Sequence, residues 1–271
     1  MNEQTAVFGF LGTGNMGGAL ARAVRRTVPG DRILLSNRTV EKAERLAGEL
    51  GCRAMDNLTL ARQADFLFLG VKPQMMEGLL TEIAPVLAER QSGFVLVTMA
   101  AGLPMARIQE MAGGAYPVIR IMPNTPAAIG EGMILYTCGE GVADADVSLF
   151  LSALSGAGRL SPLPEKLLDA GSAVSGSGPA FVDLFLEALA DGGVACGLPR
   201  AQALELAAQM TVGAARLVLE TGRHPGVLKD AVCSPAGTTI QGVRALEAGG
   251  FRSAVMEAVI ATYEKNLTLN P

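Results

Sequence analysis

The sequence predicts an α/β fold in its first part, a doubly wound sheet of the Rossmann type, followed by an all-α domain. Three observations support this. Short apolar segments alternate with helical patterns up to about residue 160, a glycine-rich turn follows the first apolar segment, and alanine- and leucine-rich helical patterns fill the remainder. Continuous apolar strands that alternate with helices are typical of a parallel sheet covered on both faces. Right-handed crossovers then give a doubly wound topology.

The first part of the chain alternates strands and helices in a regular order. Each predicted strand is an apolar run, and these runs lie at 6–11, 33–36, 66–71, 94–97, 118–122 and 133–136. Thr39 can open the second predicted helix, and Gly51 ends it. By their apolar periodicity, helices are expected at 15–26, 39–50, 74–89, 103–112 and 144–156.

The second part of the chain loses its strands near Ser161-Pro162-Leu163-Pro164. We therefore predict a first domain over residues 1–164 and a second over residues 165–271. Pro199 suits the first turn of a helix. A helical domain this apolar is expected to bury its surface in a partner subunit. The helices of this domain are expected at 165–196, 200–221, 238–248 and 252–267.

Composition excludes several classes of function. The chain of 271 residues has 22 basic and 26 acidic side chains and no basic run, so no nucleic-acid partner is expected. Its four cysteines are far apart and it has one histidine, a set that offers no zinc site of familiar spacing, and no metal is expected. The longest apolar runs are too short to cross a membrane, and the N-terminus resembles no signal peptide. A reduced, cytoplasmic protein is the expectation.

The glycine-rich turn after the first strand reads Gly12-Thr13-Gly14-Asn15-Met16-Gly17. It opens a predicted helix inside a strand–helix–strand unit, which is the context of a dinucleotide-binding fingerprint. Gly12 allows the tight turn, Gly14 lets a pyrophosphate approach the backbone, and Gly17 lets helix and strand pack closely. The amide groups and dipole of the helix N-terminus attract phosphates. The alternative is a glycine-rich turn without a ligand.

The end of the second strand selects the nucleotide. Binders of NAD usually place an acidic residue here to bind the ribose 2′-hydroxyl. This chain has Ser36-Asn37-Arg38-Thr39 instead, so no carboxylate repels a 2′-phosphate and Arg38 can pair with one. We therefore predict NADPH as the cofactor, with NADH as a weaker substitute. The alternative is that Arg38 is an ordinary surface arginine.

Loops at other strand ends agree with a cofactor at this edge of the sheet, because ligands in such folds bind beyond the carboxyl ends of the strands. Small residues and proline follow three more predicted strands, at 71–73, 100–102 and 122–126. Each loop alone is equally well explained as an ordinary turn. The predicted cofactor-binding residues are Leu11, Gly12, Thr13, Gly14, Asn15, Met16, Asn37, Arg38, Asn57, Val71, Lys72, Pro73, Ala100, Ala101 and Gly102.

Two glycine-rich segments in the helical domain offer hydroxyl and amide groups of the kind that bind a carboxylate. The first segment interrupts a helical pattern at 175–179, and the second leads into a helix at 234–239. Helix capping combined with close helix packing is the alternative for both.

The motifs together resemble the pyrroline-5-carboxylate reductase family. They read, in order, GFLGTGNMG, SNR, VKP, RIMPNTP, VSGSGPAF and DAVCSPAGTTIQG. The resemblance covers Val7 to about Asn266. It implies reduction of L-1-pyrroline-5-carboxylate, a cyclic imino acid, to L-proline with NADPH, the last step of proline biosynthesis. It also implies an NADPH-binding first domain and a helical second domain that intertwines in a dimer, and this family often assembles five dimers into a decamer.

The resemblance also implies site residues. It places the active-site hydroxyl of the family at Thr239 as the catalytic residue, and it places Glu165 near the substrate. We expect the backbone amides of Gly237, Thr238 and Thr239 to hold the substrate carboxylate, because the first turn of a helix leaves them unpaired. The alternative is that Thr238 or Thr239 only caps the helix. The predicted substrate-binding residues are Glu165, Ser175, Gly176, Gly237, Thr238 and Thr239.

The sequence departs from the family at two positions and leaves two other functions open. Ala236 stands where the family commonly has glycine, and Ala231 stands where some relatives have an asparagine that contacts the cofactor. One rival is a β-hydroxyacid dehydrogenase, but those enzymes need a lysine base early in the second domain, and residues 178–185 contain none. The other rival is a non-catalytic NADP-binding protein.

Overall fold

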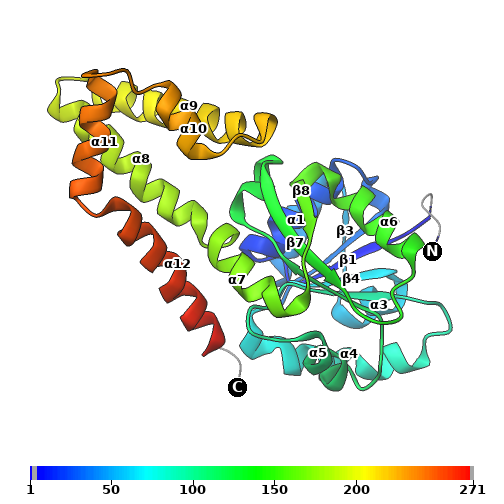
Figure 1. Cartoon of the computed structure of the whole chain (residues 1–271). Coiled ribbons are helices and arrows are strands. Elements are labelled where there is room, and N and C mark those ends of the chain that lie inside the picture. Colours follow the sequence, from blue (N-terminus) through cyan, green and yellow to red (C-terminus); the bar gives the residue numbers. More distant parts are fainter. Residues whose placement is uncertain (2–4, 269–271) are drawn as a thin grey trace. The chain divides into compact units, whose positions relative to one another are not determined.

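The computed structural model describes residue 1 and residues 5–268. It forms two compact units (Figure 1). The first extends to Ser177 and takes in the chain again from Thr262, and the second is Gly178–Ala261. The predicted domain boundary after residue 164 stays a prediction. The first unit extends beyond residue 164 because the helix α7 (Glu165–Ser175) packs its buried Leu168 against Met122 and Leu135 of the sheet.

Within the described residues, eight strands form one sheet in the order β3-β2-β1-β4-β5-β6-β7-β8. Every predicted strand is present, so the predicted fold class is confirmed. Five strands are fully buried and largely apolar, as expected for a sheet covered on both faces, and Ser36, Thr98 and Arg120 are their polar residues. The bounds are β1 Phe8–Leu11, β2 Ile33–Ser36, β3 Arg53–Ala54, β4 Phe66–Leu69, β5 Val95–Thr98, β6 Val118–Met122, β7 Gly132–Cys138 and β8 Gly158–Pro162.

The sheet is not wholly parallel, contrary to the prediction. β7 runs antiparallel to β6, whereas all the other neighbouring strands pair in parallel. The cause is the connection at 123–131, which holds only a short 3₁₀ turn. A parallel return needs a crossover of about a dozen residues or more. The sequence analysis also misses β3 and β8, because neither strand has a continuous apolar run.

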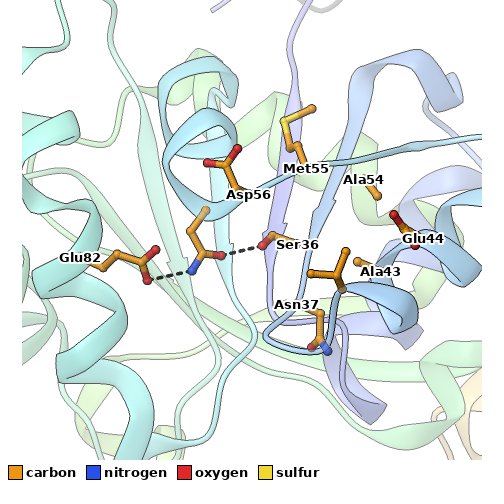
Figure 2. A pocket seen from close by; sticks show the side chains of 10 residues that line it. Ser36, Asn37, Ala43, Glu44, Ala54, Met55, Asp56 and Glu82 are labelled. Atoms are coloured by element: carbon orange, nitrogen blue, oxygen red, sulfur yellow. Dashed lines mark hydrogen bonds between the residues drawn. The ribbon is translucent and has the colours of Figure 1, made fainter.

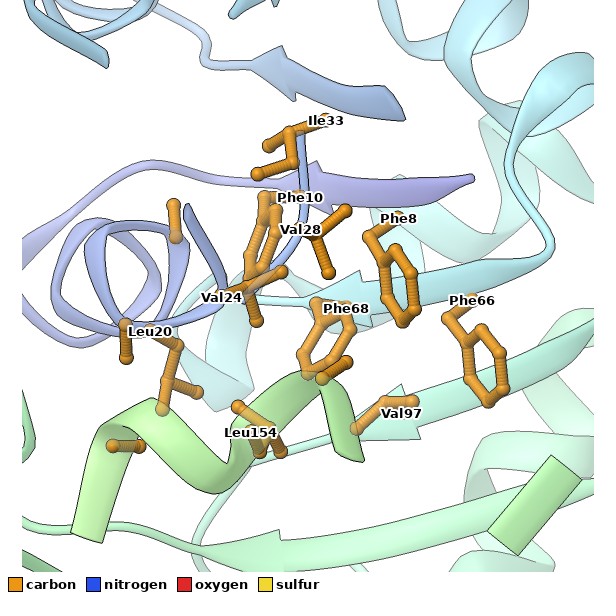
Figure 3. Close-up of a cluster of buried hydrophobic side chains, with 14 of the residues drawn as sticks. Phe8, Phe10, Leu20, Val24, Val28, Ile33, Phe66, Phe68, Val97 and Leu154 are labelled. Atoms are coloured by element: carbon orange, nitrogen blue, oxygen red, sulfur yellow. The ribbon is translucent and has the colours of Figure 1, made fainter. Parts of the chain in front are cut away.

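Helices cover both faces of the sheet, and alternate strand residues supply both cores. On one face Phe8 stacks on Phe66 with ring centroids 5.1 Å apart, and Phe10 on Phe68 at 4.5 Å (Figure 3). The helices of that cluster are α1 Asn15–Arg25, α2 Val40–Leu50 and α6 Asp144–Leu154. The cluster on the other face involves α3 Asn57–Gln63, α4 Met76–Glu89 and α5 Met105–Ala112.

Short turns complete the first unit. Gly51 ends α2 in the left-handed conformation, as predicted from the sequence. The helix α3, which the sequence analysis does not predict, is capped by Asp56. The 3₁₀ turns are η1 Gly30–Arg32, η2 Pro73–Met75, η3 Thr125–Ile129 and η4 Ser155–Ala157.

In the second unit the described chain forms helices and their connections (Figure 1). The predicted helices are confirmed, except that the segment predicted as one helix at 165–196 is divided at Gly176-Ser177 into α7 and α8. His224 caps the unpredicted α10 by accepting a hydrogen bond from the amide of Gly226 at 3.0 Å. The bounds are α8 Gly178–Ala195, α9 Arg200–Thr221, α10 Pro225–Ala231, α11 Thr238–Ala248 and α12 Phe251–Leu267, which runs on past the unit.

Candidate functional site

The glycine-rich turn has the geometry of a phosphate cradle. Gly12 has a φ of +102°, and a Cβ there would lie 2.9 Å from the carbonyl of Gly70. A Cβ at Gly17 would overlap the carbonyl oxygen of Gly12. At Gly14 a Cβ would meet nothing within 4 Å, so this residue faces open space. Gly12 and Gly17 therefore allow the close packing of β1, α1 and β4, and Gly14 leaves room for a pyrophosphate.

The groups around this cradle fit an anionic ligand. Gly14 is the N-cap of α1, and neither a side-chain cap nor an acidic first-turn residue satisfies the amides of that turn. Helix N-termini of this kind bind phosphates. The buried Oγ1 of Thr13 has no hydrogen-bond partner among the described residues. These residues therefore suit the diphosphate of a dinucleotide.

A cavity of about 520 Å³ adjoins the cradle, within the size range of small-molecule sites. Arg38, Lys42 and Lys72 line it, and each is exposed without an ion-pair partner in residues 5–268. The cavity brings together eight of the predicted cofactor-binding residues, namely Leu11, Gly12, Gly14, Asn37, Arg38, Asn57, Val71 and Lys72. The other predicted residues, which do not line it, are Thr13, Asn15, Met16, Pro73, Ala100, Ala101 and Gly102.

Asn37 and Arg38 differ in how free they are. The Oδ1 of Asn37 accepts from the backbone amide of Thr13 at 3.3 Å, and its Nδ2 donates to the carbonyl of Thr39 at 3.0 Å. Asn37 thus links the loops after β1 and β2. Arg38 makes no hydrogen bond within the described part of the chain, so its guanidinium is available to a phosphate.

A second cavity of about 360 Å³ shares Asn37, Asn57 and Glu82 with the first. Figure 2 shows the side chains that line this second cavity. Asn57 accepts a hydrogen bond from the Oγ of Ser36 at 2.6 Å and donates to Glu82 at 2.9 Å. The amide of Asn57 therefore organises this cavity. Sequence reasoning missed Glu82 and Lys42 because they lie on helix faces, whereas the sequence signals came from strand ends.

Asp56, which also lines the second cavity, has a structural role. Its carboxylate accepts hydrogen bonds from the backbone amide of Thr59 at 2.8 Å and from the hydroxyl of Thr59 at 2.7 Å. These bonds, the backbone one first, hold the pKa of Asp56 below its usual value. Asp56 therefore stays ionised as the N-cap of α3.

The loops after β4 and β5 lie at the same edge of the sheet, but only some of their predicted residues line the cavity. Ala100 is buried, and its amide donates to the Oγ1 of Thr98 at 3.4 Å. Gly102 has a φ of +75°. Pro73 begins a 3₁₀ turn for which Lys72 is the N-cap. The carboxyl ends of parallel strands lie at one edge of a sheet, so these loops lie at the same edge as the loops after β1 and β2.

The first predicted carboxylate-binding segment uses its groups differently from the expectation. The hydroxyl of Ser175 donates to the carbonyl of Gly171 at 3.1 Å, and the amide of Gly176 donates to Ser172 at 2.8 Å. Both groups are therefore satisfied within the helix. The hydroxyl of Ser177 has no hydrogen bond within the described residues.

The second segment begins with a tight turn. The amide of Gly237 donates to the carbonyl of Ser234 at 3.0 Å, so this amide is not free for a substrate, contrary to the expectation. Pro235 and Ala236 are the central residues, and the φ of +57° at Ala236 is the left-handed value that a type II turn requires. Among the described residues, Ala236 is the only one other than glycine with a positive φ.

Thr238 and Thr239 form the start of α11 directly after this turn. Both are exposed, and no side chain among the described residues caps the helix. Neither hydroxyl makes a hydrogen bond within the part of the chain described. The capping alternative therefore has no support in the geometry, and the hydroxyl of Thr239 is available for chemistry.

Glu165 lies in a network that the sequence analysis missed. Its Oε1 accepts from the backbone amide of Met105 at 2.8 Å and lies 3.5 Å from an Nη of Arg120. Arg120 is only 3% exposed and also pairs with Asp169 at 2.9 Å. Glu165 thus joins α7 to α5 and β6, and nothing in the local sequence signals a buried arginine inside an apolar strand.

Residues 165–195 are long and apolar enough, by length and composition alone, to cross a membrane. This is weak evidence. The segment comprises α7 and α8, and Asp183, Glu187 and Asp191 form a charged stripe at intervals of four residues along α8. Charged side chains at the centre of a span are costly, and this spacing is typical of a helix with one hydrated face.

Comparisons with known proteins cover both parts of the chain. A family described as pyrroline-5-carboxylate reductase dimerisation matches residues 165–269, and one described as NADP oxidoreductase, coenzyme F420-dependent, matches residues 7–102. The pyrroline-5-carboxylate reductase of Arabidopsis thaliana is 39% identical over 97% of this chain and 95% of its own length. That of Escherichia coli K12 is 40% identical over 97% of both chains.

A solved structure gives the same result. The crystal structure of a Plasmodium falciparum pyrroline carboxylate reductase with NADP bound superposes with a TM-score of 0.88 at 30% identity, covering 99% of both chains. An imine reductase from a Pseudomonas species has a TM-score of 0.57 at 19% identity and shares the fold alone.

Proposed function

The chain belongs to the pyrroline-5-carboxylate reductase family, and we propose on that basis that it reduces L-1-pyrroline-5-carboxylate to L-proline with NADPH, the last step of proline biosynthesis. It is an oxidoreductase that acts on a C=N bond. The observation that carries this conclusion is sequence identity of 39–40% to two curated reductases over 97% of the chain. The match runs through both the Rossmann-type unit and the helical unit.

The first unit supplies the cofactor site. The amides at the start of α1 hold the diphosphate of NADPH, and Gly14 leaves the room that it needs. Arg38, with Lys42 and Lys72 nearby, holds the 2′-phosphate. When bound, NADPH supplies the hydride that the imine carbon receives.

The second unit supplies groups for the substrate. The backbone amides of Thr238 and Thr239 hold the substrate carboxylate, since no side chain caps α11. The hydroxyl of Thr239 donates a hydrogen bond to the ring nitrogen and polarises the C=N bond. An alcohol is a weak acid, so this role is one of orientation and polarisation.

The chemistry of the imine separates this function from that of a β-hydroxyacid dehydrogenase. Oxidation of a hydroxyl group requires a base to accept its proton, and residues 178–185 at the start of α8 contain no lysine. An imine nitrogen is already basic and asks less of the protein. The free hydroxyl of Thr239 suits a hydrogen bond to that nitrogen and also disfavours the alternative of a non-catalytic NADP-binding protein.

We also propose that the protein acts in the cytoplasm as a homodimer built by the helical unit, with five dimers forming a decamer. The large apolar side chains that this unit leaves exposed support self-association. The family that matches residues 165–269 is described as a dimerisation domain, which supports the same assembly.

The test is a spectrophotometric assay at the nicotinamide absorbance band. NADPH should be consumed when the cyclic imine is added and should remain without it. As controls, NADP⁺ is offered with 2- and 3-hydroxy acids, which should give no reduction. Turnover of a hydroxy acid without turnover of the imine would overturn the proposed function, and cofactor binding without any turnover would favour a non-catalytic protein.

A further inference from the structure

Alternate residues from β6 onwards hold α7 along its length. Arg120 pairs with Glu165 and Asp169 in the first turns of the helix, and Met122 packs with its buried Leu168. Asn124, two residues further on, donates a hydrogen bond from its Nδ2 to the carbonyl of Ser175 at 2.9 Å. Residues at i, i+2 and i+4 of an extended chain point to one face, which places all three on the side of α7.

The dimensions of the two segments match. Asn124 has an extended backbone, so the four residues from Arg120 span about 13 Å. The helix between the two ends of this contact, from Glu165 or Asp169 to Ser175, is about 9–15 Å long. The contact therefore runs from the first turns of α7 to its last residue.

The carbonyl of Ser175 needs such a partner because of the proline four residues later. Pro179 has no backbone N–H, so it cannot donate the hydrogen bond that a continuing helix would give to Ser175. Asn124 supplies the missing donor. Its Oδ1 in turn accepts from the amide of Met133 in β7 at 2.9 Å, and the side chain is 7% exposed. Both ends of this amide are thus committed.

The segment held in this way contains one free hydroxyl. The hydroxyl of Ser175 donates to the carbonyl of Gly171, whereas the hydroxyl of the half-buried Ser177 makes no hydrogen bond within the described residues. We propose that Ser177, and not Ser175, offers the hydroxyl of this segment to the substrate, and that Asn124 is the positioning residue that holds it in place. The inference rests on the proposed reduction of the cyclic imine.

The central test is Asn124→Asp, which keeps the shape and the acceptor for Met133 but loses the donor to Ser175. The KM for the imine should rise about tenfold or more, while the KM for NADPH changes less than twofold to threefold. Ser177→Ala should raise the imine KM similarly, and the matched Ser175→Ala should not. The double variant of Asn124→Asp and Ser177→Ala should be no worse than the more affected single variant, because both changes remove one contact.

A second variant leaves Asn124 in place. Pro179→Ala restores a backbone N–H that competes for the carbonyl of Ser175, so it should raise the imine KM without lowering the melting temperature. An unchanged imine KM in folded Asn124→Asp or in Pro179→Ala, or additive effects in the double variant, would overturn the inference. The wild-type protein in the same assay tests the proposed reduction itself, so a failure of that function gives a separate result.

Discussion

The two compact units differ most in what they bury. The sheet unit encloses large side chains, with Phe8, Phe10, Phe66 and Phe68 stacked on one face and a leucine-rich cluster on the other. In the described residues 178–261 the buried side chains are three alanines, at 190, 203 and 207. Leucine, valine and phenylalanine side chains of that unit remain exposed. One unit thus completes its own core, whereas the other leaves large apolar side chains exposed, which supports the proposed self-association.

The same contrast holds for the proposed sites. In the sheet unit, groups that suit a dinucleotide come together within one chain, because glycines, strand ends and the exposed cations Arg38, Lys42 and Lys72 lie at one edge. In the helical unit Thr239 lies at a helix start where the hydroxyls of Thr238 and Thr239 have no partner within the described residues. We therefore expect substitutions at the glycine-rich cradle and its cavity to alter cofactor binding, and substitutions in the helical unit to alter assembly or turnover.

The largest expected effect, loss of the dimer and of activity, comes from a charge placed on the apolar surface of the helical unit. Leu184→Glu places a charge at a residue that is 66% exposed and lines an apolar groove with Phe185 and Phe251. Burying an unpaired charge costs about 3–5 kcal/mol, and a two-fold dimer meets each substitution twice. Sedimentation should therefore show a monomer, and imine reduction should be lost.

The matched control for this variant is Ile129→Glu in the sheet unit, where the side chain is 74% exposed. It should leave both the assembly and the activity intact. A Leu184→Glu protein that stays dimeric and active would show that the exposed apolar face is not the subunit interface, and the contrast between the two units would then need another explanation.

The second prediction concerns turnover. Thr239→Ala should lower kcat/KM for the imine about tenfold to a thousandfold, because a hydrogen bond that strengthens in the transition state is lost. The melting temperature should barely move, since the hydroxyl has no partner within the described chain. Thr238→Ala is the matched control and should retain most of the activity. An unchanged kcat/KM in a folded Thr239→Ala protein would mean that the backbone amides and the cofactor are sufficient for turnover of the imine.

The third prediction sharpens the contrast from the sheet unit. Arg38→Ala should raise the KM for NADPH about tenfold or more and spare that for NADH, because a hydrogen bond to a charged group contributes about 1.5–3 kcal/mol. Assembly should be unaffected. Arg45→Ala, on α2 and outside both cavities, is the control. Equal losses with the two cofactors would mean that Arg38 does not bind the 2′-phosphate.

The sequence predicts most of the sheet unit because its signals are local. A strand buried on both faces is largely apolar, as Phe66–Leu69 is, and the fingerprint glycines fall at fixed spacing. The direction of β7 depends on the length of the preceding connection, which apolarity does not report. β3 and β8 carry no apolar run at all.

The candidate site is predicted less completely, since it depends on which hydrogen bonds form. Sequence alone identifies Arg38, but it gives no sign that the amide of Asn37 is committed to neighbouring loops. It likewise cannot show that Gly237 spends its amide on Ser234 or that Arg120 lies buried in β6. These contacts depend on how the fold places side chains and turns relative to one another, and the local sequence does not report that placement.

The smallest expected effect separates the turn before α11 from the helix itself. Ala236 has a φ of +57°, a conformation that costs a residue with a Cβ about 1–2 kcal/mol. Glycine removes that cost and adds roughly 0.5–1 kcal/mol of chain entropy to be lost on folding. Ala236→Gly should therefore stabilise the protein by about 0.5–1 kcal/mol, a rise of about 1–4 °C in the melting temperature.

The same change a few residues later should have the opposite sign. Ala245 lies inside α11, where glycine costs about 1 kcal/mol, so Ala245→Gly should lower the melting temperature. The pair distinguishes relief of strain in the turn from a general effect of glycine on this unit. The activity of Ala236→Gly tests the role of the turn. Pro235 and the hydrogen bond from the amide of Gly237 to the carbonyl of Ser234 still form the turn in this variant, so kcat/KM should change less than about threefold. A fall in melting temperature for both variants would mean that the methyl group of Ala236 makes contacts worth more than the strain, which an exposed residue in a turn can gain only when a partner chain packs against it.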